Sequence, residues 1–256
     1  MADPFFTLAI FTPTRGFLLS ETLDTLRAQS DRDFEVFLLS DKKGTYFERV
    51  VEQYPEIQFQ IIEAKAKNRP SMMNQALRQS RGKYIQFLDS GDRYLSQSGL
   101  SFLRNLIEEN KYPELIYFGF LLRQTGLAPR ANFSLLNLKR GSIPLAKSSW
   151  FFKEALLKVG GFDEKLAFGS SFDLYCRLLK DESSRVVFCK RILTDSEPIY
   201  SFAKERVISA LEVSRVLYRY FGLYPALRWI FAQDHRKMIR STLQFLKQSF
   251  APENAS

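Results

Sequence analysis

Two aspartates, Asp89 and Asp92, close an apolar run within the stretch YIQFLDSGDRY at residues 84–94. Only Ser90 and Gly91 separate them, so both carboxylates can face a single ligand, and hard divalent cations prefer carboxylate oxygens. Asp, Ser and Gly are also the residues that ordinary turns favour. The stretch by itself therefore leaves two interpretations open, a polar turn after a buried strand or a carboxylate pair that holds a metal ion.

Polar residues follow the earlier apolar runs as well. Pro13, Thr14 and Arg15 come after the first run, and Asp41 comes after the second. The chain has neither GxGxxG after its first apolar run nor GxxxxGK[ST], so dinucleotide-binding and P-loop sites lack their glycines. A site without a glycine cradle must neutralise a diphosphate by another route, such as a divalent cation held by carboxylates. For Asp41, which precedes Lys-Lys-Gly, a simple turn remains an equal interpretation.

Short apolar runs alternate with amphipathic segments through this half of the chain. Strands are predicted at 6–11, 34–40, 57–63 and 83–89, and helices at 17–29, 46–54 and 71–79. This alternation predicts a parallel α/β sheet with helices on both faces. Right-handed crossovers place the carboxyl ends of such strands along one edge of the sheet, where ligands bind. The polar residues named above are therefore expected to meet at that edge.

The pattern is looser beyond residue 95. The predicted elements are a helix at 99–110, a strand at 115–122, a hairpin or loop at 123–144, a helix at 151–162 that ends at Gly160–Gly161, a helix at 171–180 and a strand at 184–193. After about residue 204 the chain is predicted to be entirely helical. The apolar run at 115–122 is far too short to span a bilayer and is typical of a buried strand.

Composition narrows the class of protein. The chain has 256 residues, of which 45% are hydrophobic, which is ample for a large core and excludes general disorder. Cys176 and Cys189 are the only cysteines, which fits a reducing compartment but leaves a disulfide open. Neither has a CxxC neighbour, which argues against a zinc site. The N-terminal MADPFF shows no secretory signal, so a cytoplasmic protein is expected. His235 is the only histidine and lies in a basic tail, where a solvated helix position is the simpler interpretation.

The tail carries much of the net charge of +9, because residues 201–256 contain nine Lys and Arg against four Asp and Glu. Ile239, Leu243, Leu246 and Phe250 form a helical apolar stripe with basic residues around it. Such a helix can lie on an anionic membrane, here at the inner face, or pack on the rest of the protein. A basic charge also attracts nucleic acid, but no recognised nucleic-acid module accompanies it, which argues against that partner.

The ordered motifs of the chain resemble a known family. The series FTLAIFTPTRG, LLSETLDTLRAQSDRDFEVFLLSD and NRPSMMNQALRQSRGKYIQFLDSGD is similar to the nucleotide-binding half of the family 2 glycosyltransferases, which have the GT-A fold. VGGFDEKLAFGSSFDLYCRLL at 159–179 resembles their acceptor-side segment, so the resemblance covers about residues 6–200. It implies a Rossmann-like, mostly parallel α/β sheet flanked by helices.

The resemblance also implies a domain organisation. Residues 1–203 would form the GT-A domain, with a nucleotide-binding half at about 1–95 and an acceptor half at 96–203. Residues 204–256 would form a basic helical C-terminal extension.

Roles follow residue by residue from the resemblance. The positions implied to contact the nucleotide-sugar are Pro13, Thr14, Arg15, Asp41, Asn68, Arg69, Asp89 and Ser90. The first three would line the nucleotide pocket, Asp41 would hydrogen-bond the base, and the next two would border the base and diphosphate. Asp89 and Asp92 would bind Mg²⁺ or Mn²⁺ on the diphosphate, where the ion acts as a Lewis acid for the leaving group.

Three departures from the family pattern bear on function. Gly91 stands where a carboxylate often lies, and Met73 stands where an Arg often precedes the helical Asn. The family's catalytic base is the Asp of an ED pair, and Ser171 occupies its position. An unassisted hydroxyl is no general base near pH 7. Asp173 lies two helical positions further on, about 200° around the helix, which favours a structural role.

The sequence thus predicts an inverting, cation-dependent glycosyltransferase that moves a sugar from a nucleotide-diphosphate sugar to a hydroxyl of a glycan, lipid-linked or protein acceptor, as in polysaccharide biosynthesis. The alternative is a catalytically impaired relative that binds nucleotide-sugar, glycan or a partner protein without transfer. The two hypotheses differ in whether any group replaces the missing base.

Overall fold

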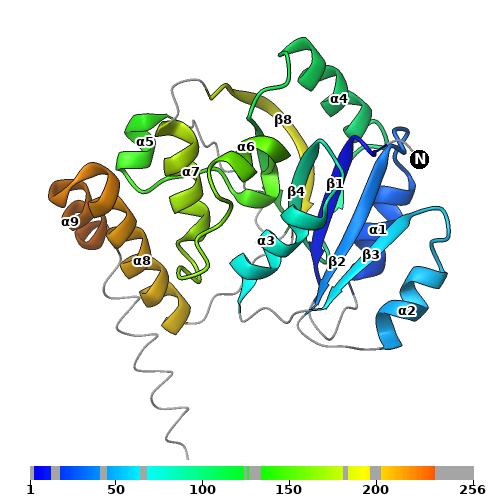
Figure 1. The fold of residues 1–256 in the computed structure, drawn as a ribbon, viewed down its shortest axis with the longest axis horizontal. Coiled ribbons are helices and arrows are strands. Elements are labelled where there is room, and N and C mark those ends of the chain that lie inside the picture. The colour runs from blue at the N-terminus through cyan, green and yellow to red at the C-terminus, as the bar shows by residue number, and fades with distance from the viewer. Residues whose placement is uncertain are drawn as a thin grey trace, which may run out of the picture.

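The computed structural model describes residues 3–12, 18–40, 45–63, 68–123, 126, 134–180, 184–196 and 203–233. Within them, one sheet has the strand order β3-β2-β1-β4-β7-β6-β8-β5. The strands are β1 (Phe6–Phe11), β2 (Phe34–Ser40), β3 (Gln58–Glu63), β4 (Tyr84–Asp89), β5 (Arg93–Tyr94), β6 (Leu115–Leu122), β7 (Ser149–Phe152) and β8 (Val186–Ser196). The sheet is curled and flanked by helices (Figure 1).

The first half of the sheet is parallel, as the sequence predicts. β1 pairs with both β2 and β4, and β2 pairs with β3, all in parallel register. Every residue of β1 and β2 is buried, which is the continuous apolar pattern of a strand covered on both faces. The carboxyl ends of these strands therefore share one edge, at which Phe11 is aligned with Asp89.

The second half is mixed, because β7 runs antiparallel to both of its neighbours, β4 and β6. Tyr84, at the start of β4, pairs with Phe152, at the end of β7. It follows that β7 begins near the edge at which β4 ends. The single helix predicted at 151–162 is wrong in its first residues, because Phe151 and Phe152 belong to β7. The buried ring of Phe151 packs in the core beside Phe87, and aromatic side chains favour such strand positions.

Helices cover both faces of the sheet. They are α1 (Leu19–Arg27), α2 (Thr45–Glu52), α3 (Arg69–Gln79), α4 (Gly99–Glu109), α5 (Leu135–Lys139), α6 (Lys153–Lys158), α7 (Ser170–Lys180), α8 (Ala203–Phe221) and α9 (Leu223–Ala232), with a 3₁₀ turn at Ala146–Ser148. Alternate residues of β1 enter two separate cores. Leu8 and Ile10 pack with α1 and α4, whereas Ala9 and Phe11 pack with α3, α6, α7 and α8.

The segment predicted as a hairpin or loop at 123–144 contains the short helix α5, whose start is capped by the Ser134 hydroxyl, which accepts a hydrogen bond from Asn137 N–H. The residues after 203 are helical as predicted, up to the end of the described part. Val216 and Leu217 of α8 lie in the core against α7. The stripe at 239–250 and His235 lie outside the described residues. No helix in the described part of the chain is long and apolar enough to cross a bilayer.

Candidate functional site

The DSGD stretch forms a tight turn at the carboxyl edge of β4. Asp92 N–H donates to the Asp89 carbonyl at 3.0 Å, and Asp89 N–H donates to Asp92 Oδ2 at 2.8 Å. Gly91 adopts φ +98°, a left-handed conformation that favours glycine, and its N–H donates to Thr22 Oγ1 of α1. The turn folds the Asp92 carboxylate inward, where the residue is 2% exposed. Asp89 remains partly accessible at the edge of the sheet.

A lysine stands between the two carboxylates. Lys147 Nζ lies 3.2 Å from Asp89 Oδ2 and 3.1 Å from Asp92 Oδ1. The Ser196 hydroxyl, at the end of β8, accepts from the same ammonium and donates to Asp92 Oδ1. The Lys147 side chain is 10% exposed, and its carbonyl accepts from Gln86 Nε2 of β4 at 2.7 Å. Both ends of this lysine are thus held by the neighbouring strands.

An arginine reaches the same carboxylate from α3. Arg69 Nη1 lies 2.7 Å from Asp89 Oδ1, and its guanidinium stacks on Phe11, 3.6 Å from the ring centroid. The Asn68 side chain caps the helix by accepting from Ser71 N–H, and it donates to the Glu164 carbonyl. This cap fixes the first turn of α3, so Arg69 is presented at the edge of the sheet with half of its side chain exposed.

These contacts set the protonation of the two aspartates. Burial by itself would raise the pKa of Asp89, but the charges of Arg69 and Lys147 outweigh it and hold that pKa below its ordinary value. For Asp92, burial raises the pKa above its ordinary value, and the attraction of Lys147 offsets only part of this. The ionised form of Asp92 therefore depends on its lysine partner.

The residues present do not fit a divalent cation in this arrangement. All four carboxylate oxygens of Asp89 and Asp92 already have partners: Arg69, Lys147, Ser196 and the Asp89 amide. A divalent ion here would also face the Lys147 ammonium, at a cost of about 4 kcal/mol per unit charge at 4 Å for an effective dielectric constant near 20. Within the described ranges, no cluster of three or more His, Cys, Asp or Glu side chains is arranged for a metal.

A second ion-pair cluster supports the turn from outside. Arg123, just after β6, donates to the Gly91 carbonyl and pairs with Asp195 of β8 at 3.0 Å. Arg93 also pairs with Asp195, at 2.8 Å. Burial by itself would raise the pKa of Asp195, but hydrogen bonds from both arginines outweigh it and hold that pKa below its ordinary value.

Sequence reasoning missed these side chains and Lys147. For Lys147 the sequence offers only one signal, a basic residue shortly before the apolar run that forms β7. The antiparallel pairing that brings this residue to the end of β4 is not visible in the sequence.

The two candidates for catalysis at the start of α7 differ in their surroundings. Ser171 is partly exposed in the first turn of the helix. Asp173 is 1% exposed and pairs with Arg177 at 2.8 Å and with Arg219 of α8 at 3.2 Å. The Tyr220 hydroxyl also donates to Asp173, at 3.1 Å. Through these contacts Asp173 has a structural role, because it links α7 to α8.

The acceptor-side segment is tied to the nucleotide-binding half through Asn74 of α3. Its amide exchanges two hydrogen bonds with the backbone of Phe162, at 2.7 and 2.8 Å, and donates to Glu164 Oε1 at 2.8 Å. Gly161, at φ +69°, lies so close that an added Cβ would be 2.5 Å from Asn74 Oδ1. Glu212 of α8 accepts from three successive amides just before α7, at residues 167–169.

Of the remaining predicted residues, only Ser90 lies in the described part of the chain. Pro13, Thr14, Arg15 and Asp41 lie outside the described residues, so their contact with a nucleotide stays a prediction. Ser90 is partly buried in the turn, and its N–H donates to the Phe11 carbonyl at 2.9 Å. The structure therefore brings together Arg69, Asp89, Ser90 and Asp92 of the predicted set, and it adds Lys147 and Ser196.

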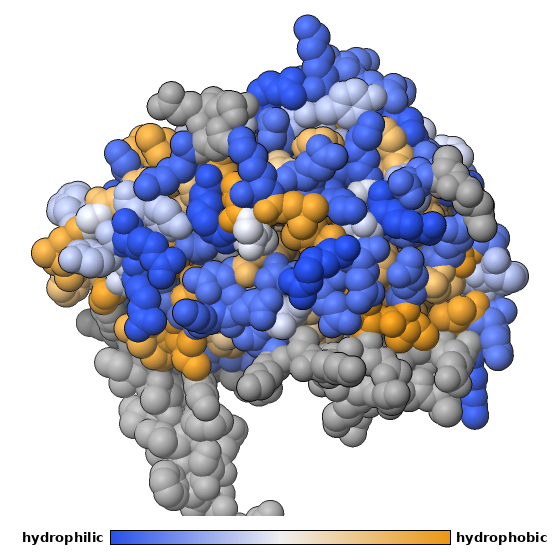
Figure 2. Space-filling view, viewed as in Figure 1, coloured by the Kyte–Doolittle hydropathy of each residue, from blue (hydrophilic) through white to orange (hydrophobic). Residues whose placement is uncertain are grey.

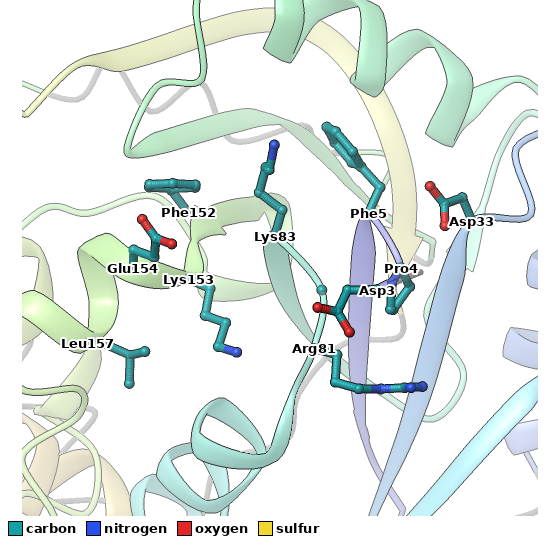
Figure 3. A pocket seen from close by; sticks show the side chains of 11 residues that line it. Asp3, Pro4, Phe5, Asp33, Arg81, Lys83, Phe152, Lys153, Glu154 and Leu157 are labelled. Carbon is teal, nitrogen blue, oxygen red and sulfur yellow. The ribbon is translucent and has the colours of Figure 1, made fainter. Parts of the chain in front are cut away.

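A cavity of about 460 Å³ lies at the opposite, amino edge of the sheet (Figure 3). Arg81, Lys83 and Lys153 line it together with three acidic side chains. Two of these cations are already engaged, because Arg81 pairs with Glu35 at 3.2 Å and Lys153 donates to the Ser80 carbonyl. None of the residues predicted to contact a ligand lies in this cavity.

Comparison with curated protein sequences gives no match. The model of glycosyl transferase family 2 matches residues 14–118, the span that contains Arg69 and the DSGD turn. Among solved structures, residues 1–349 of S. aureus TarS in complex with UDP match with 15% identity and a TM-score of 0.67, over 99% of this chain and 73% of that one. The longer TarS structure matches with a TM-score of 0.68 and 15% identity over 98% of this chain, which spans 44% of TarS.

The mannosyltransferase PcManGT from Pyrobaculum calidifontis, solved with GDP-Man and Mn²⁺, matches with 13% identity and a TM-score of 0.66, over 99% of this chain and 77% of that one. At these identities the structural likeness shows the fold alone. The family match covers Arg69 and the DSGD turn but not the acceptor-side segment at 159–179, whereas the fold is shared over nearly the whole chain. This chain accordingly has a GT-A-like fold, and its residues 14–118 are similar to glycosyl transferase family 2.

Proposed function

We propose that the protein transfers a sugar from a nucleotide-diphosphate sugar to a hydroxyl acceptor. The observation that carries this proposal is the arrangement around Asp89, which ends β4 with Arg69 and Lys147 on either side of its carboxylate. A carboxylate accepts hydrogen bonds from the hydroxyls of a ribose or sugar, and two flanking cations suit a diphosphate. The site lies at the carboxyl edge of a parallel sheet, where α/β folds bind ligands.

The reaction sets two requirements. The bond between the anomeric carbon and the diphosphate oxygen breaks, and its electron pair leaves with the nucleoside diphosphate. The acceptor oxygen forms the new bond from the opposite face, which inverts the anomeric carbon as in the family, and it releases its proton to a base. Arg69 and Lys147 supply positive charge for the departing diphosphate. For the proton, the structure offers no carboxylate at position 171.

Binding experiments with nucleotides test the donor half of this proposal. TarS is solved with UDP and with UDP-GlcNAc, and PcManGT with GDP-Man, so these three and GDP are suitable probes. A ligand at one hundred times its dissociation constant should raise the free energy of unfolding by about 2.7 kcal/mol. We expect such a shift for at least one of the four nucleotides. When the corresponding nucleotide-sugar is incubated with the protein and an acceptor, we expect release of UDP or GDP. No shift with any of them contradicts donor use.

A second candidate function, donor binding without transfer, is favoured by the surroundings of Ser171 and Asp173. The first is a hydroxyl where the family has its base, and the second is buried in ion pairs. The variant Ser171→Asp restores a carboxylate at the start of α7, and Ser98→Asp, just before α4, adds the same charge at a different helix start. If the wild type binds donor but transfers nothing, and Ser171→Asp leaves this unchanged, the binding function is correct. Transfer by the wild type excludes it.

We also propose that α8 and α9 bring the protein to an anionic membrane surface, which suits a lipid-linked acceptor. The apolar side chains exposed on these helices are Leu211, Tyr218, Leu223, Tyr224, Leu227 and Phe231. Figure 2 shows hydrophobic surface at the end of the molecule where α9 lies. Co-sedimentation with vesicles that contain anionic lipid should fall when Tyr224 and Phe231, 77% and 74% exposed, are both changed to Ser. Equal sedimentation of wild type and variant contradicts this contact.

A further inference from the structure

We propose that the Lys147 ammonium takes the place of a divalent cation, so that this protein binds the diphosphate of its donor without a metal ion. The inference rests on the proposed use of a nucleotide-sugar and deepens it. It starts from the position of the ammonium, which lies 3.2 Å from Asp89 and 3.1 Å from Asp92. These are the two carboxylates to which the resemblance to the family 2 glycosyltransferases assigns the metal.

The fold fixes this cation in position. Lys147 lies in the 3₁₀ turn directly before β7. Its carbonyl accepts a hydrogen bond from Gln86, and its ammonium also donates to Ser196 of β8. With 10% of the side chain exposed, the lysine has little freedom to leave, because its four-carbon stem is packed between strands. An ammonium with three donors that meets two carboxylates and one hydroxyl has all of its hydrogen bonds made.

The composition of the turn agrees with an internal cation. Gly91 stands where the family pattern often has a further carboxylate, so the turn has lost one oxygen ligand. The four charged side chains of the cluster, Asp89, Asp92, Lys147 and Arg69, sum to zero. The two carboxylates are therefore already balanced without a metal, and a divalent cation on the same oxygens would be repelled by the Lys147 ammonium.

Arg69 provides the charge that a diphosphate can touch. Its side chain is 49% exposed, its guanidinium is oriented by Phe11, and it pairs with the same Asp89. A guanidinium presents planar donors that match phosphate oxygens, whereas the buried ammonium acts on them as a point charge. In this arrangement Lys147 replaces the ion between the carboxylates, and Arg69 contacts the diphosphate.

Calorimetric titration of the full chain with UDP and with GDP tests the inference directly. Each titration is run in EDTA and repeated with Mn²⁺ and with Mg²⁺, and Mn²⁺ is also titrated alone. We expect dissociation constants that agree within about twofold in all three conditions and no heat from Mn²⁺ alone. Binding that requires the metal overturns the inference but leaves the proposed function intact. Absence of binding by every nucleotide in every condition overturns both.

A charge-removal variant makes the test specific for this lysine. Lys147→Ala should weaken nucleotide binding in EDTA by about tenfold or more, the range for a lost charge-assisted interaction. Mn²⁺ should restore binding, since the carboxylates become available. Lys139→Ala removes an exposed lysine at the end of α5 and should leave affinity unchanged.

Because Lys147→Ala leaves Asp92 buried without its cation, the variant can fail to fold. The double variant with Lys147→Met and Asp92→Asn removes both buried charges, and it should show the same loss in EDTA. Wild-type affinity in EDTA for either variant overturns the inference.

Discussion

Buried carboxylates at the two edges of the sheet are satisfied in different ways. At the amino edge, fully buried Glu35 of β2 accepts from the Thr7 hydroxyl at 2.8 Å, from Arg81 N–H at 2.6 Å and from Gly82 N–H at 3.2 Å. At the carboxyl edge, Asp92 meets the Lys147 ammonium. The amides that donate to Glu35 are fixed in the backbone, whereas the carboxyl edge also presents Arg69, whose half-exposed guanidinium can contact a ligand. The first arrangement supports the fold, and the second is suited to binding.

The cations around the cavity at the amino edge also have partners within the fold. Figure 3 shows Arg81, Lys83 and Lys153 around it, a set that looks suited to an anion. Lys83 nevertheless lies over the rings of Phe5 and Tyr112, and the other two cations have acceptors within the fold. The presence of a cavity therefore does not identify the edge of the sheet that binds a ligand. The partners of the charged side chains at each edge identify it.

The largest expected effect is on stability and comes from the amino edge. Glu35→Ala removes the buried acceptor of the Thr7 hydroxyl and of the amides of Arg81 and Gly82, and it frees the partly exposed Arg81 guanidinium. A hydrogen bond to a buried charged group typically contributes about 1.5–3 kcal/mol, so the free energy of unfolding in urea should fall by at least this amount. Nucleotide affinity of the folded protein should be unchanged. A large loss of affinity would show that the two edges are not functionally separate.

Two arginines give a matched pair for the comparison. Arg69 pairs with Asp89 at the carboxyl edge, and Arg81 pairs with Glu35 at the amino edge, with side chains 49% and 41% exposed. Arg69→Ala should weaken binding of UDP or GDP by about tenfold, because a charge-assisted contact to phosphate is lost. Arg81→Ala should lower the melting temperature and leave affinity unchanged. Equal effects of both variants on affinity would contradict the assignment.

The smallest expected effect is a pH dependence at the amino edge. Burial by itself would raise the pKa of Asp31, but hydrogen bonds from Arg104 and the Asp33 amide outweigh it and lower that pKa below the ordinary value of 3.8. A lowered folded-state pKa adds stability that is present above about pH 4 and is lost as the pH falls through that pKa.

Asp31→Asn should therefore be less stable than wild type at neutral pH, and the difference in the free energy of unfolding should close on acidification below pH 4. The exposed carboxylate Glu109 supplies the control Glu109→Gln, for which we expect no comparable convergence. A constant difference for Asp31→Asn across this range would contradict the ion pair with Arg104.

Local sequence patterns predicted most helices and strands correctly. They were wrong where a residue is in a strand only because a distant strand pairs with it. The strands at 6–11, 34–40 and 115–122 were predicted with the bounds observed, because continuous apolar and β-branched runs between turn residues have few other structures available. Phe151 and Phe152 were placed in a helix because KEALLK follows them directly. Their strand structure depends on pairing with β4, some 65 residues earlier, which no local window contains.

The candidate site divides in the same way. Asp89 is predicted from its position after a strand, and Arg69 from the resemblance to the family 2 glycosyltransferases. Lys147 and Ser196 were not, since each is an ordinary residue in its own segment. Both reach the Asp92 carboxylate only because β7 and β8 join the sheet beyond β4.

The sequence by itself determined the parallel α/β half of this protein and the edge at which Asp89 lies, because the alternation of strand and helix and the right-handed crossover are local rules. Only the tertiary structure decided what stands between the two aspartates. The antiparallel course of β7 brings its first residues to the end of β4, and there the chain places an ammonium beside carboxylates more than fifty residues away in sequence.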